Sequence, residues 1–201
     1  MATTSDEADV VLQLSYINTT YYFKSYSANS IGSAESEVIS FTTMAELPAV
    51  ITGDVNDIEE YSASVNGSIE DDGGAEIADK GFVYGTYSGP DMKTGYVMSA
   101  GSGSDPFSLS LSELSPNRTY YIRAYAVNSK GTSYGETLTF RTEVALPVVE
   151  FTGCSDVTSS SAVVSGKVTD HGGETVSETG FLYGTTPVLD SSTASRVKST
   201  Y

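Results

Sequence analysis

The sequence predicts an all-β protein made of tandem β-sandwich repeats, and two observations lead to this prediction. First, motifs recur 99 positions apart: residues 21–24 (YYFK) return as residues 120–123 (YYIR), and residues 81–85 (GFVYG) return as residues 180–184 (GFLYG). A fixed period of this length indicates tandem domains that each fold as one unit. Second, tyrosine (14) outnumbers phenylalanine (7), and no stretch keeps the apolar spacing of an amphipathic helix, so strands are favoured.

The complete repeat, residues 44–143, contains seven strand-like runs separated by turn residues. They are expected at residues 47–52, 62–69, 80–87, 96–98, 107–111, 119–128 and 134–142. In the second run, Ala63, Val65 and Ile69 fall at odd positions, which is the period of a half-buried strand. Residues 71–74 (DDGG) then form a turn, because glycine tolerates positive φ and aspartate caps its own backbone.

The corner before the sixth run resembles a known family. Residues 114–120 (LSPNRTY), with the run that follows them, look like the E–F corner and strand F of fibronectin type III domains. The resemblance implies an immunoglobulin-like (fibronectin type III-like) sandwich in which the phenol of Tyr120, or of Tyr21 in the first copy, bonds to upstream backbone as a tyrosine corner. The stretch from the Gly-Gly turn to GFxYG is similar to a divergent bacterial version, associated with multidomain surface proteins of Bacteroidota. The resemblance therefore implies a fold and an extracellular or cell-surface location, but no activity.

The sequence departs from that family at one core position. Fibronectin type III domains usually carry a tryptophan at the end of strand B, and this chain has no tryptophan. Gly67 and Gly166 stand at about that place. We expect Phe82 and Phe181, from the strand that follows, to fill the space.

Alternation along the sixth run places Ile122, Ala124 and Ala126 on the core face and the side chains between them outward. The outward row is Tyr121, Arg123 and Tyr125, its counterparts in the first copy are Tyr22, Lys24 and Tyr26, and Tyr134 is a second exposed aromatic. An exposed aromatic–basic–aromatic row can stack on sugar rings or contact a protein. The alternative is that cross-strand neighbours cover these rings.

The repeats are cut out of frame. Residues 1–43 contain only the end of one repeat, with residues 10–14 as its strand E, and residues 144–201 contain only strands A, B and C of another. Since the complete repeat lies between them, the halves are expected at opposite ends of the molecule and cannot easily pair within one chain. Two interpretations stay open. The chain is a slice of a longer array, or the half-repeat of one chain completes that of the next in a heterologous, propagating contact.

Charge and hydropathy argue against two classes of partner. The formal net charge is −16, with 26 acidic and 10 basic residues, which disfavours nucleic acid and anionic membranes. No stretch is apolar over the length of a membrane span, and this chain carries no signal peptide, so export would depend on a signal outside it.

No catalytic, metal or cofactor site is predicted. His171 is the only histidine and stands where the other copy has Asp72, so we interpret it as a surface residue. Cys154 is the only cysteine and is expected to be a small, buried or half-buried apolar residue. An acidic cluster lacks the spacing of a calcium loop; its members are Asp54, Asp57, Glu59, Glu60, Asp71 and Asp72. Asn18, Asn66 and Asn117 begin N-x-Ser/Thr triplets, which arise by chance in a Ser/Thr-rich chain.

The sequence thus predicts a non-enzymatic structural or adhesive repeat of an extracellular bacterial protein. Its sandwiches would be rigid and joined by short linkers at residues 46–48 (ELP) and 145–147 (ALP), because proline fixes φ. The expected partners are other copies of the chain or neighbouring repeats. The alternatives are a carbohydrate- or protein-binding module that uses the exposed tyrosines, and a phage structural appendage.

Overall fold

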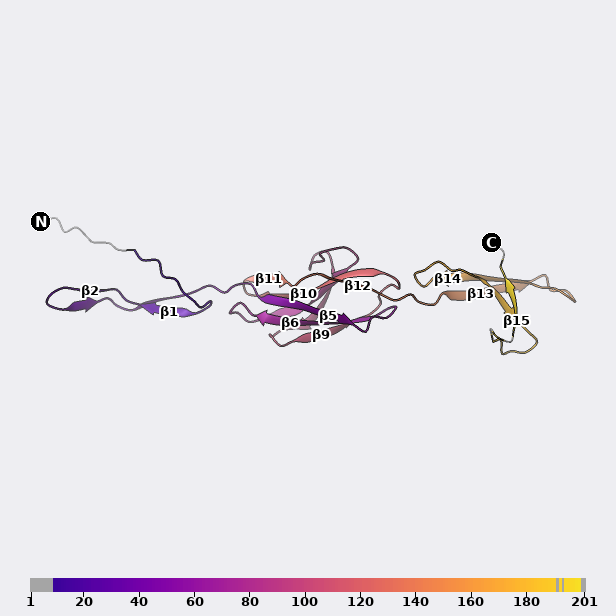
Figure 1. Cartoon of the computed structure of the whole chain (residues 1–201), viewed down its shortest axis with the longest axis horizontal. Helices are drawn as coiled ribbons and strands as arrows, with labels where there is room; N and C mark the ends of the chain where they lie inside the picture. The colour runs from indigo at the N-terminus through magenta and orange to yellow at the C-terminus, as the bar shows by residue number, and fades with distance from the viewer. Residues whose placement is uncertain (1–8, 191, 193, 200–201) are drawn as a thin grey trace.

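The computed structural model describes residues 9–190, 192 and 194–199, and every regular element among them is a β-strand. Strands β5 to β12 pack as one sandwich, with two-stranded pieces on either side along the chain (Figure 1). The all-β fold class predicted from the repeat and the composition is therefore confirmed.

The central sandwich consists of two antiparallel sheets. One sheet has the order β5 (Ala49–Asn56), β6 (Ala63–Asp71) and β9 (Phe107–Leu111). The other has the order β11 (Gly131–Tyr134), β10 (Thr119–Asn128), β7 (Asp79–Gly85) and β8 (Tyr96–Gly101), with β12 (Leu138–Arg141) also paired to β10. Two antiparallel sheets packed face to face are the architecture of immunoglobulin-like sandwiches.

The core contains aromatic rings where tryptophan would have been expected. Phe82 and Phe107 come from opposite sheets, and their ring centroids lie 5.1 Å apart. A Cβ atom added to Gly67 would lie 2.6 Å from Cζ of Phe107 and 3.1 Å from Cζ of Phe82. Phe82 therefore fills the space over Gly67 as expected, and Phe107 shares it. A glycine is required here because the two rings occupy the volume of its side chain.

The last predicted strand, residues 134–142, is two strands instead of one. The hydroxyl of Thr52 on β5 accepts a hydrogen bond from the Ala124 N–H on β10 at 2.9 Å. A continuous last strand would need that donor for its own ladder, so pairing with β10 breaks between β11 and β12. Gly135 lies at the break, where an added Cβ would be 2.5 Å from Oγ1 of Thr52.

Half-repeats stand on both sides of the central sandwich, at opposite ends of the chain (Figure 1). The N-terminal half-repeat consists of β1 (Thr20–Phe23), β2 (Tyr26–Ala28), β3 (Ser33–Glu35) and β4 (Ile39–Thr42), with β1 paired to β4 and β2 to β3. The C-terminal half-repeat consists of β13 (Val148–Ser155), β14 (Val163–Asp170), β15 (Gly180–Tyr183) and β16 (Ser195–Lys198), with β13 paired to β14 and β15 to β16.

The strand predicted at residues 10–14 is wrong, because these residues form no strand. Their counterpart in the central sandwich is β9, which is held by its ladder to β6. In the complete repeat, β6 is the strand that pairs with β9. No strand equivalent to β6 lies beside residues 10–14 in the described part of the chain. Without that partner, the backbone of an isolated strand has no hydrogen bonds to hold it extended.

Both half-repeats leave their core faces open. Val65 is 0% exposed, whereas its counterpart Val164 on β14 is 42% exposed. Phe140 is 6% exposed, whereas its counterpart Phe41 on β4 is 42% exposed. The same positions that are buried in the complete sandwich are therefore in contact with solvent at the two ends.

This difference predicts unequal effects for one substitution made at matched positions. We expect Val65→Ala to lower the free energy of unfolding of the central sandwich by about 2 kcal/mol, because it removes buried methyl groups and leaves a cavity. Val164→Ala in dilute solution should leave that transition unchanged. Denaturant unfolding followed by tyrosine fluorescence measures both, and an equal loss in the two variants would contradict the burial difference.

Candidate functional site

The junctions between consecutive repeats are the most elaborate polar arrangement in the chain, and each is built on an E–F corner. At the second junction the Tyr120 hydroxyl accepts a hydrogen bond from the Ser115 N–H at 2.9 Å. At the first, the Tyr21 hydroxyl accepts one from the Tyr16 N–H at 3.2 Å. This is the bond that a tyrosine corner requires. It fixes the loop that carries Asn117.

Asn117 and its counterpart Asn18 stand at the outer tip of these corners. Their φ angles are 52° and 43°, in the left-handed region that asparagine tolerates better than most residues. The backbone N–H of Asn117 donates to the Glu143 carbonyl at 2.8 Å, and that of Asn18 donates to the Met44 carbonyl at 3.4 Å. The tip is thereby tied to the chain that leaves the last strand.

A threonine just before each linker completes this attachment. The Thr142 hydroxyl accepts a hydrogen bond from the Arg118 N–H at 2.9 Å and donates to the Ser115 carbonyl at 2.6 Å. Thr43 makes the same two bonds, to the Thr19 N–H at 3.0 Å and to the Tyr16 carbonyl at 2.8 Å. The exit of each repeat is therefore held against its own corner.

The entry side of the next repeat offers a Gly-Gly turn. The Asp170 carboxylate accepts a hydrogen bond from the Gly172 N–H at 2.7 Å, and Asp71 does the same for the Gly73 N–H at 2.8 Å. The φ angles of Gly172 and Gly173 are 67° and 85°, which L side chains rarely adopt. The turn therefore needs glycine for its backbone conformation, and it directs a carbonyl towards the preceding repeat.

The two sides meet in one side-chain bridge. Nδ2 of Asn117 donates to the Gly173 carbonyl at 2.7 Å, and Nδ2 of Asn18 donates to the Gly74 carbonyl. Oδ1 of Asn117 accepts a hydrogen bond from Nε of Arg141 at 2.9 Å, which orients the amide. A Cβ atom on Gly173 would lie 2.6 Å from the Pro116 carbonyl oxygen, so the repeats approach as closely as the backbone allows.

The linkers are bound along their length as well. The Glu46 N–H donates to the Gly73 carbonyl at 2.9 Å, and the Ala145 N–H donates to the Gly172 carbonyl at 2.9 Å. Nδ2 of Asn128, in the turn between β10 and β11, donates to the carbonyls of Glu46 and Asp72 at 2.7 and 2.8 Å. The Glu46 linker is thus hydrogen-bonded to two turns of the central sandwich.

The tyrosine row lies differently from the sequence prediction. Tyr125 is 0% exposed, and its hydroxyl donates to the Asp79 carboxylate at 2.8 Å, so its prediction as an outward contact residue is wrong. The guanidinium of Arg123 lies 4.0 Å from the ring centroid of Tyr134, and both are half-buried, as is Tyr121. Alternation identifies the sheet face correctly, but neighbouring groups cover it in part: Asp79 binds the Tyr125 hydroxyl, and the Met92 N–H in the loop after β7 donates to the Tyr134 hydroxyl at 3.2 Å.

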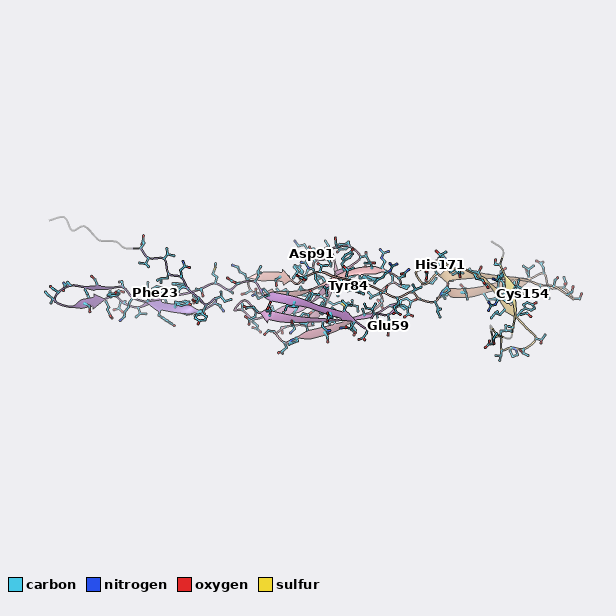
Figure 2. All side chains as sticks on the ribbon, in the orientation of Figure 1. Phe23, Glu59, Tyr84, Asp91, Cys154 and His171 are labelled. Carbon is cyan, nitrogen blue, oxygen red and sulfur yellow. The ribbon has the colours of Figure 1, made fainter. Side chains whose placement is uncertain are left out.

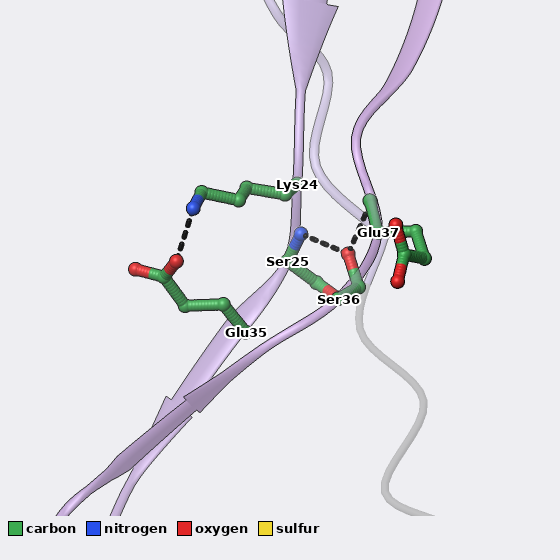
Figure 3. Close-up of polar contacts among 5 residues, drawn as sticks. All are labelled: Lys24, Ser25, Glu35, Ser36 and Glu37. Carbon is green, nitrogen blue, oxygen red and sulfur yellow. Dashed lines mark hydrogen bonds and ion pairs between the residues drawn. The ribbon is translucent and has the colours of Figure 1, made fainter.

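In the N-terminal half-repeat the same row is open. Tyr22 and Tyr26 are exposed, and Lys24 forms an ion pair with Glu35 from the neighbouring strand (Figure 3). The Ser25 N–H also donates to the Ser36 hydroxyl at 3.0 Å, which joins the same two segments. These tyrosines are exposed because β1 and β2 are each paired on one edge only, to β4 and β3, whereas β10 is also paired to β7 on its other edge. Binding of a glycan by this row stays a prediction.

The remaining chemistry-bearing residues stand apart from one another. His171 lies at the end of the C-terminal half-repeat that faces the central sandwich (Figure 2). Cys154 is exposed, so its predicted burial is wrong, because the sheet that would cover β13 is not present beside it. Within the described residues, His, Cys, Asp and Glu side chains do not gather in a group of three or more that could hold a metal ion. The described residues also contain no helix able to span a membrane.

Comparisons with known proteins find similar folds only. No protein-family model and no curated protein matches the chain. The sensor domain of the anti-sigma factor RsgI4 of Pseudobacteroides cellulosolvens is similar, with 21% identity over 49% of this chain and 96% of that chain and a TM-score of 0.36. Domains d3 and d4 of the rat CD45 extracellular region are similar too, with 14% identity over 71% of this chain and 74% of that chain and a TM-score of 0.46. Likenesses at these values carry no argument about function.

The burial of Tyr125 predicts a dependence of stability on alkaline pH. Burial, and next the Asp79 carboxylate that accepts its hydrogen bond, raise the pKa of Tyr125. Because the folded state holds this proton more tightly than the unfolded chain, the contribution to stability is complete below pH about 10 and falls as the pH rises further. We expect Tyr125→Phe to flatten this alkaline fall in the free energy of unfolding. Tyr61→Phe, at an exposed position just before β6, is the control and should keep the wild-type slope.

Proposed function

We propose that this chain is a non-enzymatic structural repeat of an extracellular bacterial protein, and that its function is mechanical. It holds consecutive sandwiches in an extended line at fixed spacing. The observation that carries the proposal is the bridge from asparagine to glycine, which occurs at both junctions with the same residues 99 positions apart. Because matching residues form this bridge at both junctions, the bridge is a property of the repeat and not of one loop.

Stiffness follows from how the bonds are distributed. Each junction is fixed at the exit by Thr43 or Thr142, at the tip by the asparagine, and at the linker by its backbone bond to the Gly-Gly turn. Rotation of one repeat against the next would break at least two of these bonds, each worth about 1 kcal/mol. Proline at positions 48 and 147 limits the linker backbone further.

The extracellular and adhesive parts of the proposal have separate support. The formal net charge of −16 favours the solubility of an extended chain. It also repels nucleic acid and anionic lipid. The open core faces of the two half-repeats support a head-to-tail contact that would continue the line beyond one chain. Such an array would place whatever it carries at a set distance from its origin.

The junction proposal is tested by the distance between neighbouring repeats. Spin labels on the exposed native Cys154 and on Ser110→Cys, an exposed position of β9, report the spacing of the C-terminal half-repeat and the central sandwich. We expect a narrow distance distribution in this labelled chain. Adding Asn117→Ala and Gly173→Ala should widen it at least twofold, because the bridge is lost and the turn is strained.

Asn66→Ala is the matched control for that experiment. Asn66 also begins an N-x-Ser triplet, but it is exposed on β6 away from both junctions. The control should keep the narrow distribution. A distribution that stays narrow when Asn117 and Gly173 are both replaced would mean that other contacts set the spacing.

A further inference from the structure

We propose that the N-terminal half-repeat of one copy of this chain joins the C-terminal half-repeat of a second copy, and that Asn29 closes the composite sandwich. The inference rests on the head-to-tail contact in the proposed function and names the residues that make it. Four observations lead to it: the strands available, the open edges, the open core faces and an exposed asparagine amide whose counterpart holds the linker in the central sandwich.

The two half-repeats together hold the strand types of the central sandwich except β9, whose counterpart at residues 10–14 forms no strand. In the central sandwich β10 pairs with β7, and Ile122 lies opposite Tyr84. The counterpart of β10 is β1, and the counterpart of β7 is β15. The same register places Phe23 of one copy opposite Tyr183 of the other. Lys24 would then lie opposite Leu182.

The open edges of the half-repeats are complementary. Strand β1 pairs with β4, with Tyr21 opposite Phe41, as β10 pairs with β12. Strand β15 pairs with β16, with Phe181 opposite Val197, as β7 pairs with β8. Each strand thus has the neighbour expected on one side and lacks the one on the other side. An unpaired edge is a template for a strand of the right register.

The core faces offer matching apolar surface. Tyr183 is 57% exposed, whereas its counterpart Tyr84 packs against the core at 6.3 Å from the ring of Tyr120. An open hollow of about 800 Å³ lies at the second junction, lined by Asn117 of the central sandwich and, on its apolar side, by Val168 and Val176 of the C-terminal half-repeat. The counterpart of Val176 is Ile77, which is fully buried in the central sandwich. The apolar side of the hollow therefore belongs to the part of the half-repeat that forms core in a complete repeat.

Asn29 supplies the most specific part of the argument. In the central sandwich Oδ1 of Asn128 accepts bonds from the N–H groups of Lys130 and Gly131, at 2.9 and 3.3 Å, which turns Nδ2 towards its two carbonyl partners. Oδ1 of Asn29 accepts the same bonds from Ile31 and Gly32, at 2.8 and 3.2 Å. Asn29 is exposed to solvent, and within the described residues its Nδ2 makes no hydrogen bond to the protein.

The C-terminal half-repeat holds the acceptors that Asn29 needs. The counterparts of the Glu46 and Asp72 carbonyls are those of Ala145 and His171. The Ala145 N–H bonds to the Gly172 carbonyl at 2.9 Å, as the Glu46 N–H bonds to Gly73, so the acceptor turn has the same form. Nδ2 of Asn29 from one copy would therefore donate to the carbonyls of Ala145 and His171 of the next.

The first experiment is the solution mass of the 201-residue chain by light scattering over a concentration series. We expect the mass to rise with concentration in multiples of 21.2 kDa. Asn29→Ala should raise the concentration needed for half-assembly about tenfold, because two hydrogen bonds to the partner are lost. Asn66→Ala should leave it unchanged.

The second experiment tests the register with disulfides. In a Cys154→Ser background, Lys24→Cys and Leu182→Cys are made in separate chains and mixed under oxidation. Opposed residues of paired strands lie about 5 Å apart at Cα, which suits a disulfide. We expect a one-to-one disulfide dimer from the mixture and little from either variant alone. Ser160→Cys in place of Leu182→Cys is the control and should give none above background.

The outcomes separate the inference from the function on which it rests. A mass that stays at 21.2 kDa at every concentration would overturn both the head-to-tail contact and the composite sandwich, while the rigid junction is judged by the spin-label distances. If Asn29→Ala leaves assembly unchanged and no mixed disulfide forms, the head-to-tail contact stands and the composite sandwich is overturned.

Discussion

The amide of Asn117 can hold the next repeat only because the corner beneath it is fixed. The Tyr120 phenol secures the loop from below, and Thr142 secures the departing chain from the side. An asparagine on a mobile loop would lose more conformational entropy on binding than one hydrogen bond returns. The same tyrosine corner that stabilises a single sandwich therefore also positions the amide that bonds to the next one.

The sequence predicted the strands well where burial alone decides them. The expected bounds of residues 107–111 and 119–128 match β9 and β10, because alternating apolar residues leave one register that buries them. The last strand was harder, since its break depends on the Thr52 hydroxyl from the other sheet. The strand predicted at residues 10–14 does not form, because an apolar pattern alone does not hold a strand that has no partner strand.

The candidate site was visible in the sequence only as spacing. Asn18 and Asn117, and likewise Gly74 and Gly173, recur 99 positions apart, but nothing in a one-dimensional pattern says that the corner of one repeat touches the turn of the next. Tyr125 was misplaced because alternation gives the face of a sheet and not what covers it. Here the Asp79 carboxylate binds the Tyr125 hydroxyl, and the side chain is buried.

The bridging asparagines, Asn18 and Asn117, also begin N-x-Thr triplets. The same side chain can therefore either bond to the next repeat or carry a sugar. The nitrogen that donates to the Gly74 and Gly173 carbonyls is the atom to which a eukaryotic secretory pathway attaches an N-linked sugar. A sugar added before folding would occupy the place of the next repeat at both junctions. Each sandwich would still fold around its own core. The host that makes the chain would thus decide whether neighbouring sandwiches are held in a fixed arrangement or move independently of one another.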